Sequence, residues 1–220
     1  MKNGQDTTVG GRRSSARQED LARGMVRPAP RRSPVPQVAA RPAILRVVIR
    51  PARPDDLEEA TLMERRVWGR LGASLNELQR RLFALPEAFL LAELQRPGQT
   101  PRLVGLTNGL LWTRDYPRTY LEYERALPSG SHNPRGDVLY LASLGVEPGM
   151  RGHGIGLRLL QEAIEVGRRR HLKQVRLIAS SRSRPLCERA GLTMVRPLPR
   201  LFRQHRDLMP QPVLMEALFT

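Results

Sequence analysis

Four glycines between residues 149 and 156 form the stretch of the sequence best suited to hold an anion. The segment reads VEPGMRGHGIG over residues 146–156. Glycine has no side chain, so its backbone N–H group can approach a ligand closely. A helix start adds unpaired N–H donors and the positive end of the helix dipole. We therefore predict that the backbone of residues 151–156 cradles a phosphate group, and that Arg151 adds a charge-assisted hydrogen bond.

A buried strand is predicted before this loop and an amphipathic helix after it. Residues 138–146 (VLYLASLGV) form a short apolar run, which is typical of a central strand. From Ile155 to Val166, apolar residues repeat at helical spacing, which predicts a helix over residues 155–170 with one buried face. The next strand is predicted at residues 175–179. These elements would hold the glycine loop at the edge of a sheet.

The remaining elements are predicted from periodicity and from turn residues. We expect strands at residues 45–52, 89–94, 103–112, 192–195 and 213–219, and helices that begin near Arg53, Ser74 and Arg184. Gly105 and Gly109 interrupt the strand at 103–112 and predict a bulge or a close backbone approach.

Two common phosphate-binding loops do not fit the sequence. A P-loop needs Gly-Lys-Ser/Thr at the helix start, but Gly156 is followed by Leu157 and Arg158, so no hydroxyl is placed for magnesium. A dinucleotide-binding loop needs G-x-G-x-x-G and an acidic residue about twenty positions further on. The glycine spacing differs, and the following strand ends in Ser180 and Ser181 without a carboxylate.

The spacing Arg-x-x-Gly-x-Gly of Arg151, Gly154 and Gly156 resembles that of the GNAT superfamily of acyl-CoA-dependent N-acyltransferases. LGVEPGMRGHGIGLRLLQEAIEVG (144–167) is similar to the strand, loop and helix of the family's CoA motif. RLIASSRSRPLCERAGL (176–192) is similar to its second motif, and VVIRPARPDDLEEATLME (47–64) to its first strand and helix. The resemblance covers residues 45–219.

The resemblance implies an α/β fold with a GNAT-like mixed, mostly antiparallel sheet, whose splayed central strands are flanked by helices. The strands at 138–146 and 174–179 would part where the pantetheine of acetyl-CoA, the implied co-substrate, enters. Backbone of the first strand would bond the pantetheine, and the glycine loop would hold the pyrophosphate. The expected cofactor-binding residues are Leu144, Gly145, Val146, Arg151, Gly152, His153, Gly154, Ile155, Gly156 and Ser180.

The resemblance also implies direct attack of a primary amine on the acetyl group. An alkylamine with a pKa of about 10.4 is mostly protonated at neutral pH, so a base helps. In this family a tyrosine of the second motif often protonates the departing thiolate. Cys187 stands at that position here, Ser180 replaces the usual asparagine, and Leu192 stands where phenylalanine is common. Cys187 is thus a candidate acid, with a buried packing role as the alternative.

No carboxylate identifies itself as the base from the sequence alone. Glu124 is our candidate because it lies with Glu122 in the long connection 113–137, which we expect to wall the acceptor site. A solvated loop is the alternative for both residues. We expect His132 to fix this loop by a hydrogen bond. The single cysteine and the lack of a histidine pair at helical spacing predict no metal site.

A basic tail is predicted to precede the N-acetyltransferase domain. The chain has 220 residues and a formal charge of +16. Residues 1–43 are rich in Pro and Arg and lack apolar periodicity, so we expect them to be disordered, and residues 44–220 to form the domain. The tail either stays solvated or contacts RNA, DNA or anionic lipid through its charge. It has no aromatic residue for base stacking.

The composition predicts a cytoplasmic protein. One cysteine forms no internal disulfide, and no run of about 18 apolar residues is present to span a membrane. The expected acceptor is a small molecule or a peptide, and the expected state is a monomer or a homodimer. Two other functions stay open: a CoA-binding or interaction module whose chemistry has lapsed, and a protein acetyltransferase recruited to nucleic acid by the tail.

Overall fold

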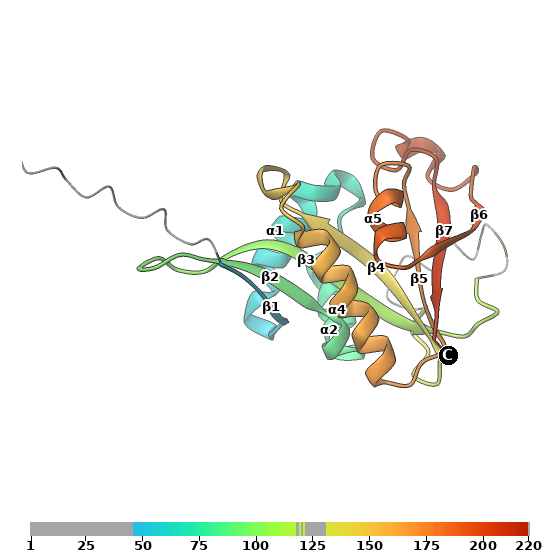
Figure 1. The fold of residues 1–220 in the computed structure, drawn as a ribbon, viewed down its shortest axis with the longest axis horizontal. Coiled ribbons are helices and arrows are strands. Elements are labelled where there is room, and N and C mark those ends of the chain that lie inside the picture. The colour runs from blue at the N-terminus through green and yellow to red at the C-terminus, as the bar shows by residue number, and fades with distance from the viewer. Residues whose placement is uncertain (1–45, 118, 120, 122–130, 220) are drawn as a thin grey trace, which may run out of the picture. The chain divides into compact units, whose positions relative to one another are not determined.

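The fold is a seven-stranded sheet with helices on both faces (Figure 1). The computed structural model describes residues 46–117, 119, 121 and 131–219. The predicted tail and the candidate base Glu124 lie outside these residues. The strand order is β1-β2-β3-β4-β5-β7-β6. The strands are β1 (Arg46–Pro51), β2 (Leu90–Gln95), β3 (Arg102–Trp112), β4 (Val138–Val146), β5 (Gln174–Ala179), β6 (Thr193–Pro197) and β7 (Val213–Leu218).

All neighbouring strands are antiparallel except β4 and β5, which run parallel. The predicted fold class, a mixed and mostly antiparallel sheet flanked by helices, is confirmed. Each strand and helix expected within the described residues is present, and β4 has the predicted bounds.

The helices are α1 (Leu57–Trp68), α2 (Leu75–Ala84), α4 (Ile155–Arg169) and α5 (Arg184–Arg189). Short 3-10 turns are η1 (Pro54–Asp56), η2 (Gly69–Leu71), η3 (Pro86–Ala88), η5 (Pro148–Met150) and η6 (Arg203–His205).

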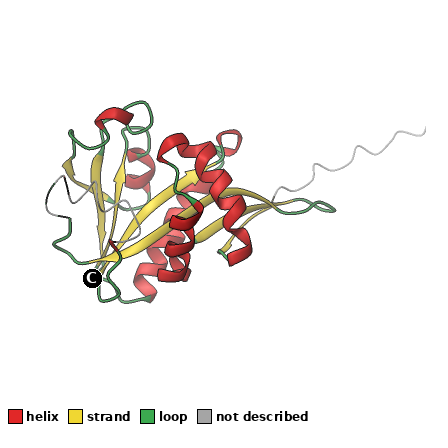
Figure 2. Cartoon of the chain, turned by 180° about the vertical axis from the view of Figure 1, so that it is seen from behind, coloured by secondary structure: helices red, strands yellow, loops and turns green. Residues whose placement is uncertain are grey.

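The helices cover the sheet in two groups (Figure 2). Apolar residues of α4 pack with β2 to β5 and β7 in the larger core, which also takes in Leu186 and Cys187 of α5. Apolar residues of α1 and α2 pack with Leu91, Leu103 and Leu106 in a second core. The sheet is therefore buried on both faces, and a site on it must lie where its strands separate.

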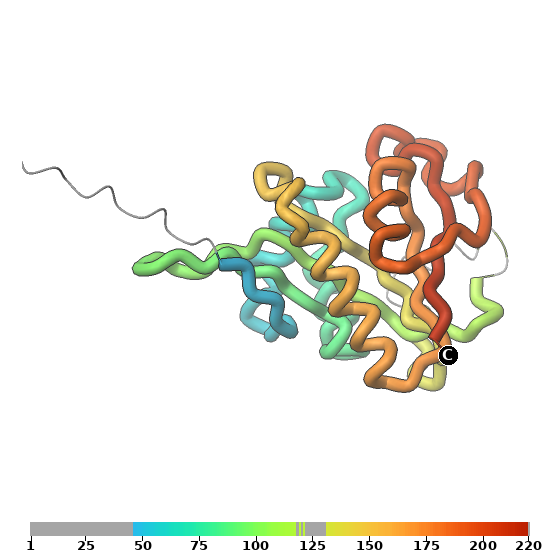
Figure 3. Tube along the Cα trace, in the orientation of Figure 1, coloured from blue at the N-terminus to red at the C-terminus, as the bar shows by residue number. Residues whose placement is uncertain are grey.

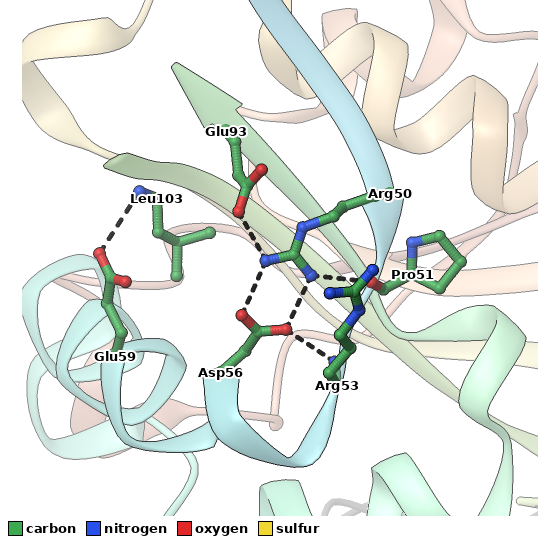
Figure 4. Close-up of polar contacts among 7 residues, drawn as sticks. All are labelled: Arg50, Pro51, Arg53, Asp56, Glu59, Glu93 and Leu103. Carbon is green, nitrogen blue, oxygen red and sulfur yellow. Dashed lines mark hydrogen bonds and ion pairs between the residues drawn. The ribbon is translucent and has the colours of Figure 1, made fainter. Parts of the chain in front are cut away.

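An arginine on β1 fixes the start of α1 (Figure 4). Arg50 donates to both carboxylate oxygens of Asp56 at 2.7 Å and to Glu93 Oε1 on β2 at 2.5 Å. The hydrogen bonds from Arg50 lower the pKa of Asp56. The same carboxylate accepts the N–H of Arg53 at 2.7 Å. This cluster ties the turn before α1 to two strands, and so sets the position of α1 on the sheet.

The two central strands separate along their length (Figure 3). Pairing of β4 with β5 runs from Val138–Gln174 to Leu141–Leu177, and no residue of β4 beyond Leu141 pairs with β5. A bulge lies at the same place, because Asn108 of β3 pairs with Ser143 and Gly109 pairs with Leu141, which leaves Ala142 without a partner on β3. Bulges are common beside active sites, where they redirect side chains.

Candidate functional site

The loop between β4 and α4 has the backbone conformation that its glycines allow. Gly152 and Gly154 have φ angles of +81° and +75°. A side chain is rarely tolerated in this left-handed region. A Cβ atom at either residue would meet nothing within 4 Å, so the backbone conformation and not packing requires glycine here.

The first turn of α4 presents N–H groups that the helix does not use. The first intrahelical bond runs from Arg158 N–H to the Gly154 carbonyl at 3.1 Å. The N–H groups of residues 155–157 precede that bond and so have no acceptor within the helix. Gly154, the N-cap, offers no side chain, and the first turn has no acidic residue. The donors and the positive end of the helix dipole are thus available to an anion.

Three other residues of the loop fix its shape. A Cβ at Gly156 would lie 3.0 Å from Leu186 and 3.4 Å from Val146, so Gly156 lets α4 approach α5 and β4. His153 Nδ1 lies 2.9 Å from the Arg151 carbonyl, within the loop. Arg151 is exposed, and its Nε donates to the carbonyl of Val146 at 3.3 Å. The loop is therefore closed onto the end of β4.

The phase of the β3–β4 ladder determines which backbone groups of β4 face the open edge. Glu147 N–H donates to the Val104 carbonyl at 3.0 Å, and Leu106 pairs with Gly145. In an antiparallel ladder this phase directs both polar groups of Gly145 toward β3. Those of Leu144 and Val146 point to the opposite edge, where β5 has separated. Leu144 and Val146 are thus better placed than Gly145 to bond a ligand.

Ser180 and Ser183 bond each other where β5 leads into α5. Ser180 N–H donates to Ser183 Oγ at 3.0 Å, and Ser183 N–H donates to Ser180 Oγ at 3.3 Å. Ser180 is buried and its carbonyl accepts the N–H of Arg184 at 2.9 Å. The side chain expected to contact the cofactor is therefore engaged in starting this helix.

Cys187 is a core residue in the structure. It is 1% exposed and packs in the larger core. Burial, followed by the nearby charge of Glu188, raises the pKa of its thiol to about 12. Proton transfer from such a group to a departing thiolate with a pKa near 8.5 is unfavourable by several kcal/mol, at about 1.4 kcal/mol per pKa unit. The packing role is favoured over the role of acid.

A cavity of about 130 Å³ lies on the α1–α2 side, beside the point where β4 and β5 separate. Its walls come from α1, η2, α2, the middle of β4, β5 and the segment between β6 and β7. The lining residues are Glu64, Trp68, Leu71, Ala73, Glu77, Arg81, Tyr140, Leu141, Ala142, Ser143, Ile178, Phe202 and Met209.

The wall of this cavity contains a buried carboxyl group. Glu64 is 2% exposed, and its Oε2 accepts the N–H of Ala73 at 3.3 Å. Burial raises the pKa of Glu64, and the Ser143 side chain, the N–H of Ala73, the charge of Arg81 and the Asn108 side chain partly offset that rise. Glu64 Oε1, Trp68 Nε1 and Ser143 Oγ are buried and have no hydrogen-bond partner within the described part of the chain. These three unpaired atoms line one cavity.

The sequence analysis missed Glu64, although a signal was present. Leu57, Ala60, Thr61, Glu64 and Trp68 follow the i, i+3, i+4, i+7, i+11 spacing of one helix face. A carboxylate on an apolar helix face is rarely buried without a partner. His132 behaves as expected, because its Nδ1 accepts the N–H of Leu111 at 3.2 Å and so fixes the connection.

Among the residues that the structure describes, no three His, Cys, Asp or Glu side chains gather as metal ligands. No helix of the described chain is long and apolar enough to cross a membrane.

The sequence profile of the acetyltransferase (GNAT) family matches residues 70–192, more than half of the chain. The chain therefore belongs to the GNAT acetyltransferase family. The match includes β4, the glycine loop, α4, β5 and α5. No curated protein sequence matches the chain significantly.

Several solved structures share the fold at low sequence identity. The loading GNATL domain of CurA from Lyngbya majuscula has a TM-score of 0.64 at 16% identity, over 79% of this chain and 98% of that one. The GNAT-like decarboxylase GphF in complex with isobutyryl-CoA has a TM-score of 0.61 at 22% identity, over 78% and 98%. The ribosomal-protein-alanine N-acetyltransferase from Brucella melitensis has a TM-score of 0.54 at 20% identity, over 78% and 99%.

Proposed function

We propose that the protein is an N-acyltransferase that moves an acyl group, with acetyl as the first candidate, from acyl-CoA to a primary amine of a small molecule or peptide. One observation supports this most strongly. The glycine loop, with its free N–H groups, and the open edge of β4 adjoin each other at the end of a single strand. A long ligand with phosphates at one end and amides at the other fits such an arrangement.

The residues of the loop and of β4 fit the chemistry of CoA. The backbone of residues 151–156, with the free N–H groups of the first turn of α4, would hold the pyrophosphate. Backbone of Leu144 and Val146 would bond the pantetheine amides. Arg151 is exposed and can turn from the Val146 carbonyl to a phosphate, where a charge-assisted bond is stronger. Gly145 and Ser180 would contribute by shape, since their polar groups have partners within the protein.

Bound acyl-CoA supplies an activated acyl carbon as a thioester. The parted strand would present backbone N–H to the acyl oxygen, where negative charge develops during transfer. Thr107 supports the strand beside the bulge, because its Oγ1 donates to the Ser143 carbonyl at 2.8 Å. A fixed donor stabilises developing charge without reorganising during the reaction.

The donor and the reaction need to be tested together, because the structurally similar proteins named above include a loading domain, a decarboxylase and an N-acetyltransferase. Release of CoA from acetyl-, propionyl- and isobutyryl-CoA would be measured with and without a panel of primary amines, and products identified by mass spectrometry. We expect release that depends on the amine, together with an acylated amine. Release without an amine product would contradict N-acyl transfer.

The same measurements separate a lapsed module from an enzyme. A lapsed module would bind acyl-CoA, as shown by calorimetry, but would acylate no amine above the uncatalysed rate. We favour the enzyme because the cavity beside the open strand holds unpaired polar groups. Buried polar groups without partners cost stability, so their presence in a protein without activity would be unexplained.

A further inference from the structure

We propose that the cavity beside the bulge of β4 receives the acceptor as an ammonium group and that Glu64 takes its proton. This inference rests on the acyl-transfer function proposed above. Ala142 and Ser143 of β4 form part of the cavity wall, so its contents lie next to the strand whose open edge would hold the acyl donor. Glu64 of α1 also lines this cavity.

Unpaired polar atoms give the first argument. Glu64 Oε1, Trp68 Nε1 and Ser143 Oγ are buried without a hydrogen bond of good geometry in the described structure, although Ser143 lies near enough to lower the pKa of Glu64. An unpaired buried donor or acceptor costs about 1–3 kcal/mol, so a folded protein rarely keeps several together without a ligand or water. A carboxylate accepts N–H bonds from an ammonium group, and a serine hydroxyl can accept another. The indole N–H then remains for a carbonyl oxygen.

The size and lining of the cavity define the class of acceptor. A volume of about 130 Å³ is below the range of roughly 300–1,000 Å³ that encloses a drug-sized ligand. The cavity therefore admits only the reactive end of an acceptor. Trp68, Tyr140 and Phe202 line it, and aromatic faces attract cations. The predicted substrate is a primary amine at the end of an unbranched alkyl stem.

The charges around Glu64 leave room for one cation. Arg81 of α2 also lines the cavity, and its guanidinium donates to Asn108 Oδ1 at 3.0 Å and lies 3.8 Å from Glu77 Oε1. Among the described residues that line the cavity, Glu64 and Glu77 carry the negative charges and Arg81 the positive one. An ammonium group supplies the second positive charge, and the pairing offsets the desolvation of the buried carboxylate.

Glu64 accepts the first proton of the ammonium group, and the thiolate of CoA accepts the second. One N–H bond of the ammonium group breaks, an O–H bond forms on Glu64 Oε1, and the electron pair stays on nitrogen. The nitrogen then bonds the acyl carbon, and the C–S bond breaks with its electron pair left on sulfur. A second proton passes from nitrogen to that sulfur. Glu64 finally returns its own proton to solvent. Burial raises the pKa of Glu64 toward that of an amine, which makes the first step less unfavourable.

Glu64→Gln tests this role, and Glu59→Gln is the matched control. Glu59 is also on α1 and also accepts a backbone N–H, that of Leu103 at 3.3 Å, but it does not line the cavity (Figure 4). We expect Glu64→Gln to lower kcat/KM for n-butylamine by about 10²-fold, the usual size of a lost general base. Its affinity for acyl-CoA should stay within twofold of wild type, and Glu59→Gln should match wild type in both.

Two further readouts separate a proton acceptor from a structural residue. Hydroxylamine is mostly neutral at pH 7, so Glu64→Gln should use it almost as well as wild type does. Independently of turnover, carbon-13 NMR should show that n-butylamine lowers the pKa of the Glu64 carboxyl, since a bound cation stabilises the carboxylate. That resonance is assigned by its loss in Glu64→Gln.

The outcomes distinguish this inference from the proposed function. If wild type binds no acyl-CoA, the proposed function fails and the inference falls with it. If wild type acylates amines and Glu64→Gln does so equally well, the function stands and the inference is wrong. An equal loss of kcat/KM in Glu64→Gln with n-butylamine and with hydroxylamine would also overturn the inference. Glu64 would then support the structure of the site and would not accept the proton of the amine.

Discussion

Glu64 has one carboxylate oxygen bonded to Ala73 N–H and the other unpaired in the cavity wall. Because burial raises its pKa above the ordinary value of 4.5, the folded state binds the proton more tightly than the unfolded state. The protonated Glu64 side chain therefore makes its whole contribution to the free energy of unfolding below pH 4.5. That contribution is lost as the pH rises through the pKa of Glu64 in the folded state. Ser143, the N–H of Ala73, Arg81 and Asn108 oppose this rise in the pKa of Glu64. Glu77 is the other carboxyl group that lines the cavity.

We therefore expect the free energy of unfolding of wild type, relative to Glu64→Gln, to fall as the pH rises above 4.5 and through the pKa of Glu64 in the folded state. The fall should be about 1.4 kcal/mol for each unit by which the pKa is raised. Urea denaturation at several pH values measures it, with Glu59→Gln expected to parallel wild type. Parallel curves for wild type and Glu64→Gln would show that the carboxyl is not perturbed.

A second prediction at the scale of residues concerns Cys187. A buried thiol whose pKa is raised to about 12 has almost no thiolate at pH 8, so the native protein should react with thiol reagents only after unfolding. Cys187→Ala should lower stability by about 1–2 kcal/mol through lost packing, while the rate of amine acylation stays within twofold. A hundredfold loss of rate in a folded Cys187→Ala protein would instead indicate that Cys187 protonates the departing thiolate.

Among the elements, α4 packs closely on β3 because Gly105 of that strand has no side chain. A Cβ on Gly105 would lie 2.9 Å from Leu159 Cδ1 and 3.1 Å from Ile155 Cγ2, both on α4. Gly105→Ala should therefore cost about 1–3 kcal/mol by overpacking. Gly149→Ala is the control, since nothing lies within 4 Å of its Cβ position, and we expect a change within about 0.5 kcal/mol. Thermal and urea unfolding measure both, and equal effects would contradict this account of how α4 is seated.

The β4–loop–α4 unit is predictable from sequence because every local signal agrees. The apolar run, the glycines and the helical repeat all point to a strand, an anion-binding turn and a helix. The close approach at Gly105 and the irregularity at Gly109 were also indicated by glycines within a strand. The bulged residue itself, Ala142, could not be foreseen, because nothing in VLYLASLGV distinguishes it. It follows from pairing with a strand thirty residues away.

The acceptor cavity was less predictable because its walls come from distant parts of the chain. Glu64, Ser143 and Phe202 meet only after the sheet has formed and the β6–β7 segment has closed over it. Helical spacing places Glu64 on the inner face of α1, but it gives neither the unpaired oxygen nor the cavity. Cys187 and Ser180 were selected by alignment of motifs, which does not report the burial and the serine–serine bonds that engage them.

At the scale of the whole molecule, the basic residues before β1 offer a separate test. Residues 1–43 precede the first described strand, and we propose that they form a tail that is not needed for acyl-CoA binding. Deleting them should leave the melting temperature and the acyl-CoA affinity unchanged. If they contact RNA, the deletion should also flatten the dependence of RNA affinity on salt. An unchanged slope would exclude the tail as the contact, and a lower melting temperature would make it part of the domain.

In the function proposed above, the glycine loop before α4 holds the phosphates of acyl-CoA. Isothermal titration of acetyl-CoA into wild type, Gly154→Glu and Gly98→Glu tests it most directly. Gly154 and Gly98 have φ angles of +75° and +72° and open space at the Cβ position, so the two substitutions impose similar backbone strain. We predict that Gly154→Glu weakens binding at least 100-fold, or about 2.7 kcal/mol, and that Gly98→Glu binds as wild type does. Equal affinity of all three proteins, or no binding by wild type, would contradict the account.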